Sequence, residues 1–220
     1  MCYTVYAVKT DIKERGRHVS CRKKMKQKLD VKKLTMSAVM IALSVALSLV
    51  KIFQMPLGGS VTLLSMLPIC MLSIMYGTRW GLFSAFVYSL TQLGLDIASV
   101  LSWGLTPQSL VGTIIFDYLV AFTVLGFAGL FRTKGVGGYI GGISLAMAMR
   151  VVSHVISGVI FFASWAPEGW NPFIYSICYN GAYMVPEAVF TFIGAVVLFK
   201  EPHTAKLFKV YQTEAKPAVH

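Results

Sequence analysis

The chain has 220 residues, of which 56% are hydrophobic and only 13% charged, and its mean hydropathy is +0.67. A soluble domain carries about a quarter charged residues, so this composition argues against a soluble enzyme or a soluble binding module. The net charge of +11 does not indicate a nucleic-acid partner, because eleven of the twenty lysines and arginines lie in the first 34 residues, next to an apolar segment. Lipid headgroups and membrane topology explain such a basic arm more simply.

Residues 1–33 are therefore predicted to form a basic cytoplasmic arm. Met25 is followed by a strongly basic stretch, residues 26–33, so translation could also start there. Residues 1–24 would then be a mis-assigned extension. A cleavable signal peptide fits poorly, because its basic region would be far too long and further apolar segments follow.

Residues 34–200 predict one transmembrane domain of six helices, since apolar segments of roughly 17–25 residues cross a bilayer as helices. Glycine and proline punctuate the joints between the segments. The fold class expected is an all-α integral membrane protein, and residues 201–220 are expected to form a short cytoplasmic tail. The six segments are residues 34–53, 61–76, 80–101, 109–131, 136–165 and 172–199.

The distribution of basic residues predicts that both chain ends are cytoplasmic. If the chain crosses six times, the basic residues of its connections and its tail fall on the same side as the N-terminal arm. The opposite connections contain no lysine or arginine, although Lys51 lies near the outer end of the first segment. The basic residues on the cytoplasmic side are Arg79, Arg132, Lys134, Lys200, Lys206 and Lys209.

The first segment carries small residues at a regular spacing. Ala38, Ala42 and Ala46 recur every four residues, which gives a smooth helix face on which another helix can pack closely. The partner could be another subunit or another helix of the same bundle, and the sequence favours neither.

Polar side chains of the later segments are predicted to converge in the outer half of the membrane. Asp117 lies eight residues into the fourth segment, roughly 12 Å deep at 1.5 Å per residue, and Tyr118 follows it. His154 lies at a similar depth in the fifth segment, and Arg150 one turn deeper. In the sixth segment, Tyr175 lies near the mouth and Asn180 a little over one turn below it.

The third segment adds Tyr88, Gln92 and Asp96 at helical i, i+4 spacing, rising toward the same side. Polar groups in apolar spans are expensive and usually face a bundle interior or a site. A buried carboxylate needs a cation or several donors, so Asp117 either forms an ion pair with Arg150 or faces a cationic ligand.

Aromatic residues gather at the outer ends of the fifth and sixth segments. An interfacial belt explains Trp170 best, whereas Phe162, Trp165 and Tyr175 are candidates for stacking on a ligand. Asn180 offers a donor and an acceptor to the edge of a heterocycle. Together these groups favour a flat, nitrogen-rich and cationic solute.

No cofactor or metal is expected. The four cysteines form no CxxC pair, and the chain has no phosphate loop, HExxH or GxSxG motif. Two other hypotheses stay open at this point: an intramembrane enzyme that uses His154 and Asp117 as an acid/base pair, and a stand-alone solute carrier.

Three ordered segments stand out along the chain: Met55–Pro68, Phe116–Phe131 and Arg150–Asn180. These segments resemble the substrate-binding S components of energy-coupling factor (ECF) vitamin transporters, specifically the thiamine-specific family. The resemblance covers about residues 30–200, and the alanine stripe is similar to the small-residue motif by which S components dock on their coupling subunit.

The resemblance implies high-affinity vitamin capture at the outer face of a bacterial cell membrane. It also implies ATP-driven uptake through a transmembrane coupling subunit and two cytoplasmic ATPases. By position, Asp117 and Tyr118 would face the thiamine rings, and His154 with an aromatic partner would sandwich the ligand. Tyr175 and Asn180 would bond the aminopyrimidine, while Tyr88 would line the pocket.

Two positions depart from the family pattern. The acid at Asp117 is shorter by one methylene than the glutamate of some members. Where a stacking tryptophan is expected, the chain has Phe161-Phe162 and then Trp165 one turn later. Either Phe162 or Trp165 would stack, and a related vitamin such as pyridoxine or hydroxymethylpyrimidine is the alternative ligand.

Overall fold

The computed structural model describes residues 31–214, which divide into two compact units between Val39 and Met40. Most of the predicted basic arm, including the alternative start at Met25, lies outside the described residues. One helix, Val31–Leu49, runs through the division. In the first unit, the Ser37 hydroxyl of this helix donates to the backbone carbonyl of Lys33 at 2.8 Å.

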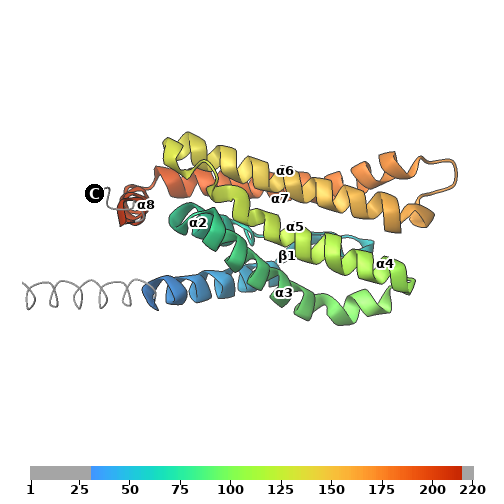
Figure 1. The fold of residues 1–220 in the computed structure, drawn as a ribbon. Helices are drawn as coiled ribbons and strands as arrows, with labels where there is room; N and C mark the ends of the chain where they lie inside the picture. The colour runs from blue at the N-terminus through green and yellow to red at the C-terminus, as the bar shows by residue number, and fades with distance from the viewer. Residues whose placement is uncertain (1–30, 215–220) are drawn as a thin grey trace, which may run out of the picture. The chain divides into compact units, whose positions relative to one another are not determined.

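The second unit is predominantly helical (Figure 1). The helices α6 (Gly135–Phe161) and α7 (Pro172–Lys200) run alongside each other and contact each other along their length. Short 3₁₀ turns, η4 (Arg132–Lys134) and η5 (Ala163–Trp165), flank α6. The principal helices are α2 (Leu67–Tyr76), α3 (Thr78–Ser102), α4 (Pro107–Gly112), α6 (Gly135–Phe161), α7 (Pro172–Lys200) and α8 (Pro202–Glu214).

A β-hairpin occupies the end of the first predicted apolar segment and the start of the second. The strands β1 (Lys51–Gln54) and β2 (Ser60–Thr62) pair antiparallel, and the 3₁₀ turn η1 (Pro56–Gly58) joins them. The first helix therefore ends at Leu49 rather than at Phe53, and the second begins at Leu67 rather than at Val61. Proline and two glycines favour a tight turn here, and Gly58 has a φ of +89°, which glycine adopts without steric cost.

The fourth predicted segment is one continuous but irregular helix. After α4, residues Thr113–Val120 form a π-helix, η2, and one turn of α-helix, α5 (Ala121–Thr123), follows. A 3₁₀ stretch, η3 (Val124–Gly129), then completes it. A π-helix is rare and is often found at a functional site.

The core at the α8 end of the unit is apolar and aromatic. Every residue of α2 from Leu67 to Met75 is buried. The rings of Tyr139, Phe199 and Phe208 pack together with centroid distances of 5.1 to 5.8 Å, which ties α8 to α6 and α7. The predicted tail at residues 201–220 thus includes a helix that packs on the bundle.

Four of the described helices are long and apolar enough to cross a membrane: Val31–Leu49, Thr78–Ser102, Pro107–Phe161 and Pro172–Lys200. The continuous stretch Pro107–Phe161 contains two of the predicted segments, and α2 is a shorter apolar helix. These helices agree with a membrane protein, while the count of six crossings remains a prediction.

Candidate binding site

A cavity of about 400 Å³ opens between α3, η2, α6, α7 and the hairpin. Its wall combines apolar rings with carboxylates, an amide, an imidazole and hydroxyls. The structure brings together all eight residues predicted to contact a ligand: Tyr88, Asp117, Tyr118, Phe162, His154, Trp165, Tyr175 and Asn180.

Asp117 projects from the π-helix and is held by two side chains of α6. Its Oδ1 lies 2.8 Å from His154 Nδ1, and the Ser157 hydroxyl donates to Oδ2 at 2.6 Å. Because the carboxylate accepts at Nδ1, that nitrogen carries a proton, and in the neutral ring Nε2 is an acceptor. His154 Nε2 is buried and has no hydrogen-bond partner among the described residues, so a ligand donor can satisfy it.

Tyr118 follows Asp117 and faces a different wall. Its hydroxyl donates to Asp96 Oδ2 on α3 at 3.3 Å, a long hydrogen bond. One turn before Asp96, the Gln92 side-chain amide donates to the Ser48 hydroxyl at 2.8 Å. Asp117 and Tyr118 therefore connect the fourth predicted segment to α6 on one side and to α3 on the other.

Asn180 lies on α7 in a hydrogen-bonded setting. Its Nδ2 donates to the Ser176 carbonyl at 2.9 Å, and its Oδ1 accepts from the Tyr183 hydroxyl at 2.8 Å. An amide oxygen has two lone pairs, so Oδ1 retains one for a ligand. Gly158 permits this arrangement, because a Cβ there would collide with Ser176 Oγ.

The tyrosines of α7 form a ladder along the cavity. The ring of Tyr179 lies 6.2 Å from that of Tyr175 and 6.0 Å from that of Tyr183. The Tyr179 hydroxyl donates to the Pro56 carbonyl, and a Cβ on Gly59 would lie 2.8 Å from the Tyr183 ring. The hairpin turn therefore packs directly on α7.

The two candidate stacking residues lie at the end of α6. Phe162 is half-buried, whereas Trp165 is 46% exposed, and both line the cavity. Trp103 also lines it and packs over Gly58 of the hairpin turn. Which of Phe162 and Trp165 stacks on a ligand therefore stays a prediction.

Arg150 forms a buried ion pair, but not with Asp117. Its Nη1 lies 3.1 Å from Glu187 Oε2, and the two side chains are 6% and 1% exposed. Glu187 also accepts from the Thr62 hydroxyl at 2.5 Å, and the guanidinium lies 4.7 Å from the centre of the Phe122 ring. Arg150 also contacts the Met66 sulfur. Since Glu187 neutralises Arg150, no arginine or lysine among the described residues pairs with Asp117, whose contacts are the His154 imidazole and the Ser157 hydroxyl.

Sequence reasoning missed Glu187, although the signal was the same as for Asp117. Both are single acids within an apolar run, and an ionisable residue in such a run is a site hypothesis by default. Gln92 and Asp96 stand out in the sequence without being predicted ligand contacts, and both line the cavity.

The acid and imidazole contact each other as the enzyme hypothesis required, but the nearby hydroxyl does not complete a catalytic arrangement. Ser157 donates to Asp117 rather than to His154, so no nucleophile among the described residues is bonded to the base. No group of three or more metal-ligating side chains occurs within residues 31–214.

The alanine stripe lies on an open helix face. Ala42 and Ala46 are exposed, whereas Ser44 and Ser48 on the opposite face are buried in the second unit. Ala38, in the first unit, is exposed as well. The stripe is therefore not used for packing inside the second unit.

Comparison with known proteins decides the family. The family model described as "Thiamine transporter protein (Thia_YuaJ)" matches residues 34–207. The chain belongs to this family. This confirms the resemblance to thiamine-specific S components, and the family is one of transport proteins rather than enzymes.

Individual members of the family and one solved structure agree. The chain is 33% identical to the thiamine transporter ThiT of Bacillus subtilis over 189 residues, 80% of this chain and 94% of the relative. It is 27% identical to the ThiT of Lacticaseibacillus paracasei over 165 residues, 68% and 80% of the two chains. A structure of ThiT from Listeria monocytogenes has the same fold, with a TM-score of 0.63, 23% identity, and coverage of 81% of this chain and 98% of that one.

Proposed function

We propose that this protein is the membrane-embedded substrate-binding subunit of an ECF-type importer and that it captures thiamine. The observation that carries the proposal is the cavity wall, where Asp117 has no basic partner except His154 among the described residues. A carboxylate in such a setting attracts a permanent cation, and the thiazolium ring of thiamine is one.

The remaining walls suit the other parts of the vitamin. Asn180 Oδ1 and His154 Nε2 supply acceptors for the amino group of the pyrimidine ring. The rings of Tyr175, Phe162 and Trp165 supply flat apolar surface for stacking. Tyr88 is buried on α3 and closes the cavity from that side.

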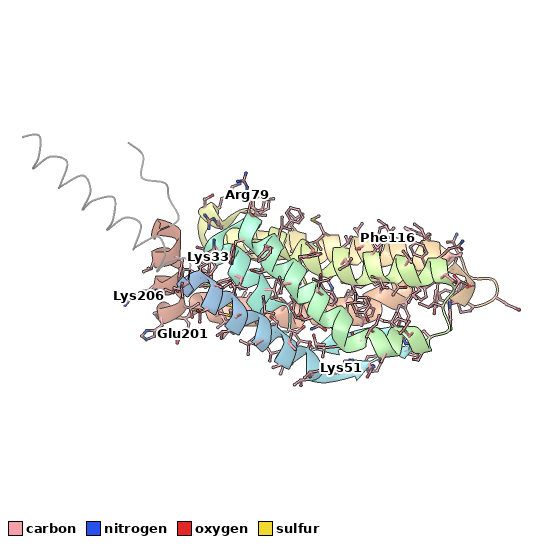
Figure 2. The ribbon with its side chains drawn as sticks, turned by 60° about the horizontal axis from the view of Figure 1, so that its bottom comes forward. Lys33, Lys51, Arg79, Phe116, Glu201 and Lys206 are labelled. Atoms are coloured by element: carbon pink, nitrogen blue, oxygen red, sulfur yellow. The ribbon has the colours of Figure 1, made fainter. Side chains whose placement is uncertain are left out.

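The topology we propose has six crossings, with both termini in the cytoplasm of a bacterial cell. The domain is residues 34–200, preceded by the basic arm 1–33 and followed by the tail 201–220. Figure 2 supports a cytoplasmic end of the second unit, because Arg79 and Lys206 lie toward the end that carries α8, whereas Lys51 and Phe116 lie away from it. Basic residues favour the cytoplasmic side of a membrane.

We propose that transport itself requires partners: a transmembrane coupling subunit and two cytoplasmic ATPases. The chain has no phosphate-binding loop of its own. The exposed stripe of Ala38, Ala42 and Ala46 is the proposed docking face, since small residues let another helix approach closely. A bulky residue at position 42 should stop uptake by the assembled transporter and leave thiamine binding by the isolated subunit intact. Loss of binding together with uptake would argue against this docking role.

The decisive experiment is a titration of the detergent-purified protein with thiamine, followed by quenching of tryptophan fluorescence, with pyridoxine as the parallel ligand. Trp103 and Trp165 line the cavity and serve as reporters. We expect saturable thiamine binding that weakens in Asp117→Asn by roughly 10- to 150-fold, the equivalent of about 1.5–3 kcal/mol for an interaction with a charged group. The matched control is Glu168→Gln, which neutralises an exposed acid in the connection after α6 that does not line the cavity.

Each alternative has its own result. Binding of pyridoxine or hydroxymethylpyrimidine instead of thiamine would keep the S-component function and change the vitamin. Folded protein that binds none of these ligands would contradict the proposal.

A further inference from the structure

One carboxylate that lines the cavity, that of Asp96, has no part in the proposed function. Asp96 lies on α3, is half-buried and lines the cavity. Its contact with the Tyr118 hydroxyl is long, at 3.3 Å, and no basic side chain within residues 31–214 forms an ion pair with it. A carboxylate offers about four lone-pair positions, so the contact with Tyr118 alone leaves most of the acceptor capacity of Asp96 unused.

The cavity lining contains three carboxylates, Asp96, Asp117 and Glu187, and two permanently charged bases, Arg150 and Lys51. Arg150 and Glu187 neutralise each other at 3.1 Å, and Asp117 is engaged by His154 and Ser157. The remaining base of the lining, Lys51, lies on an exposed strand, where water screens it. A ligand group near Asp96 therefore meets uncompensated negative charge in surroundings that screen it less than water does.

The positions of Asp117 and Tyr118 indicate which part of a ligand reaches Asp96. Asp117 contacts α6, beside Asn180 of α7, whereas Tyr118 contacts α3. If the pyrimidine ring uses the acceptors of α6 and α7 and the cation lies at Asp117, the rest of thiamine extends toward Tyr118 and Asp96. That remaining part is a side chain ending in a primary alcohol, the group that carries phosphate in the esters of thiamine.

We propose that Asp96 is a specificity-determining residue that accepts a hydrogen bond from the free alcohol of the ligand and repels its phosphate ester. This inference rests on the proposed function, because it takes thiamine as the ligand. A hydroxyl can donate to a carboxylate, whereas a phosphate monoester at neutral pH brings mainly acceptor oxygens and a charge of about −1.5 to −2. The same side chain thus favours one form of the vitamin and disfavours the other.

The test compares thiamine with thiamine monophosphate on the same protein, by the fluorescence titration described above. The quantity of interest is the ratio of the two dissociation constants. We expect the wild-type protein to bind thiamine more tightly, and Asp96→Asn to reduce the ratio about tenfold or more, because one unit charge near the phosphate is removed. Most of the change should be tighter binding of the monophosphate, with thiamine weakened only modestly.

Two further variants keep the outcome interpretable. Asp96→Ser removes the charge with a smaller side chain, so it replaces Asp96→Asn if that variant does not fold. Tyr118→Phe removes the hydrogen bond to Asp96 but keeps its charge, and it should shift both ligands in the same direction and preserve the ratio. Glu168→Gln is the control for a lost acidic charge outside the cavity.

The possible failures are distinguishable. If wild-type protein binds thiamine but the ratio stays within twofold in both Asp96 variants, Asp96 has no role in specificity and the proposed function stands. Equal affinity of the wild type for the two ligands would overturn the proposal in the same way. If folded wild-type protein does not bind thiamine at all, the proposed function fails and this inference fails with it.

Discussion

The two ends of the second unit are built by different rules. At the α8 end, regular helices bury apolar and aromatic side chains, and α2 is buried along nearly its whole length. Around the cavity, a π-helix and a hairpin with a 3₁₀ turn surround carboxylates and a buried ion pair. Burial of apolar side chains stabilises a fold, whereas burial of a charged side chain costs free energy unless the charge is paired. Stability alone therefore does not explain the charged residues at the irregular end.

The largest effect on stability should come from the charged end. Glu187→Ala leaves the Arg150 guanidinium buried without its carboxylate and removes the acceptor of the Thr62 hydroxyl. Breaking a buried pair in this way costs about 3–5 kcal/mol, which thermal unfolding in detergent should reveal. Replacing both partners, as in Arg150→Met with Glu187→Leu, should restore much of the loss. A double variant no more stable than Glu187→Ala would show that the unpaired charge of Arg150 is not the cause of the lost stability.

An intermediate effect is expected where α6 and α7 come closest. Gly158→Ala introduces a methyl group that collides with Ser176 Oγ, and overpacking of this kind costs about 1–3 kcal/mol. Because Ser176 also holds Asn180, thiamine affinity should fall together with the unfolding temperature. Adding Ser176→Gly removes the clashing side chain and should recover stability more than affinity. Unchanged affinity in Gly158→Ala would separate the packing of these helices from the site.

The smallest effect should come from the aromatic end. Phe208→Leu exchanges one buried apolar side chain for another and should lower stability by about 1.5 kcal/mol or less. Thiamine affinity should not change, because Phe208 does not line the cavity. Measuring unfolding temperature and affinity on the same preparation checks both statements. A loss of affinity would mean that the two ends are coupled.

The sequence predicted the composition of the site better than its architecture. Asp117, His154 and Asn180 could be identified because polar groups in apolar runs are rare, and helical rise placed them at similar depths. All eight predicted contacts reach one cavity. The ion pair of Arg150 was harder to predict, because two acids are available to it and Glu187 is a single acid among the apolar residues of α7.

The hairpin and the π-helix could not be foreseen from periodicity. The hairpin is short, and its first strand is flanked by apolar residues that also suit a membrane helix. Its pairing depends on contacts with α7 that are distant in sequence, such as Thr62 with Glu187. The π-helix has a composition, TIIFDYLV, that fits an α-helix equally well, so only its neighbours distinguish the two.

In residues Thr113–Gly129, a π-helix is followed by one turn of α-helix and then by a 3₁₀-helix. A π-helix is underwound relative to an α-helix and a 3₁₀-helix is overwound, so the angular deviation of the first is offset by the second. Asp117 can thereby turn toward α6 while Gly126 and Gly129 still fit closely against α3 and α2. Deleting one residue within this stretch would rotate one of these surfaces away from its partner even if every remaining side chain were kept. The spacing between Asp117 and the glycines is therefore as much a part of the site as the side chains themselves.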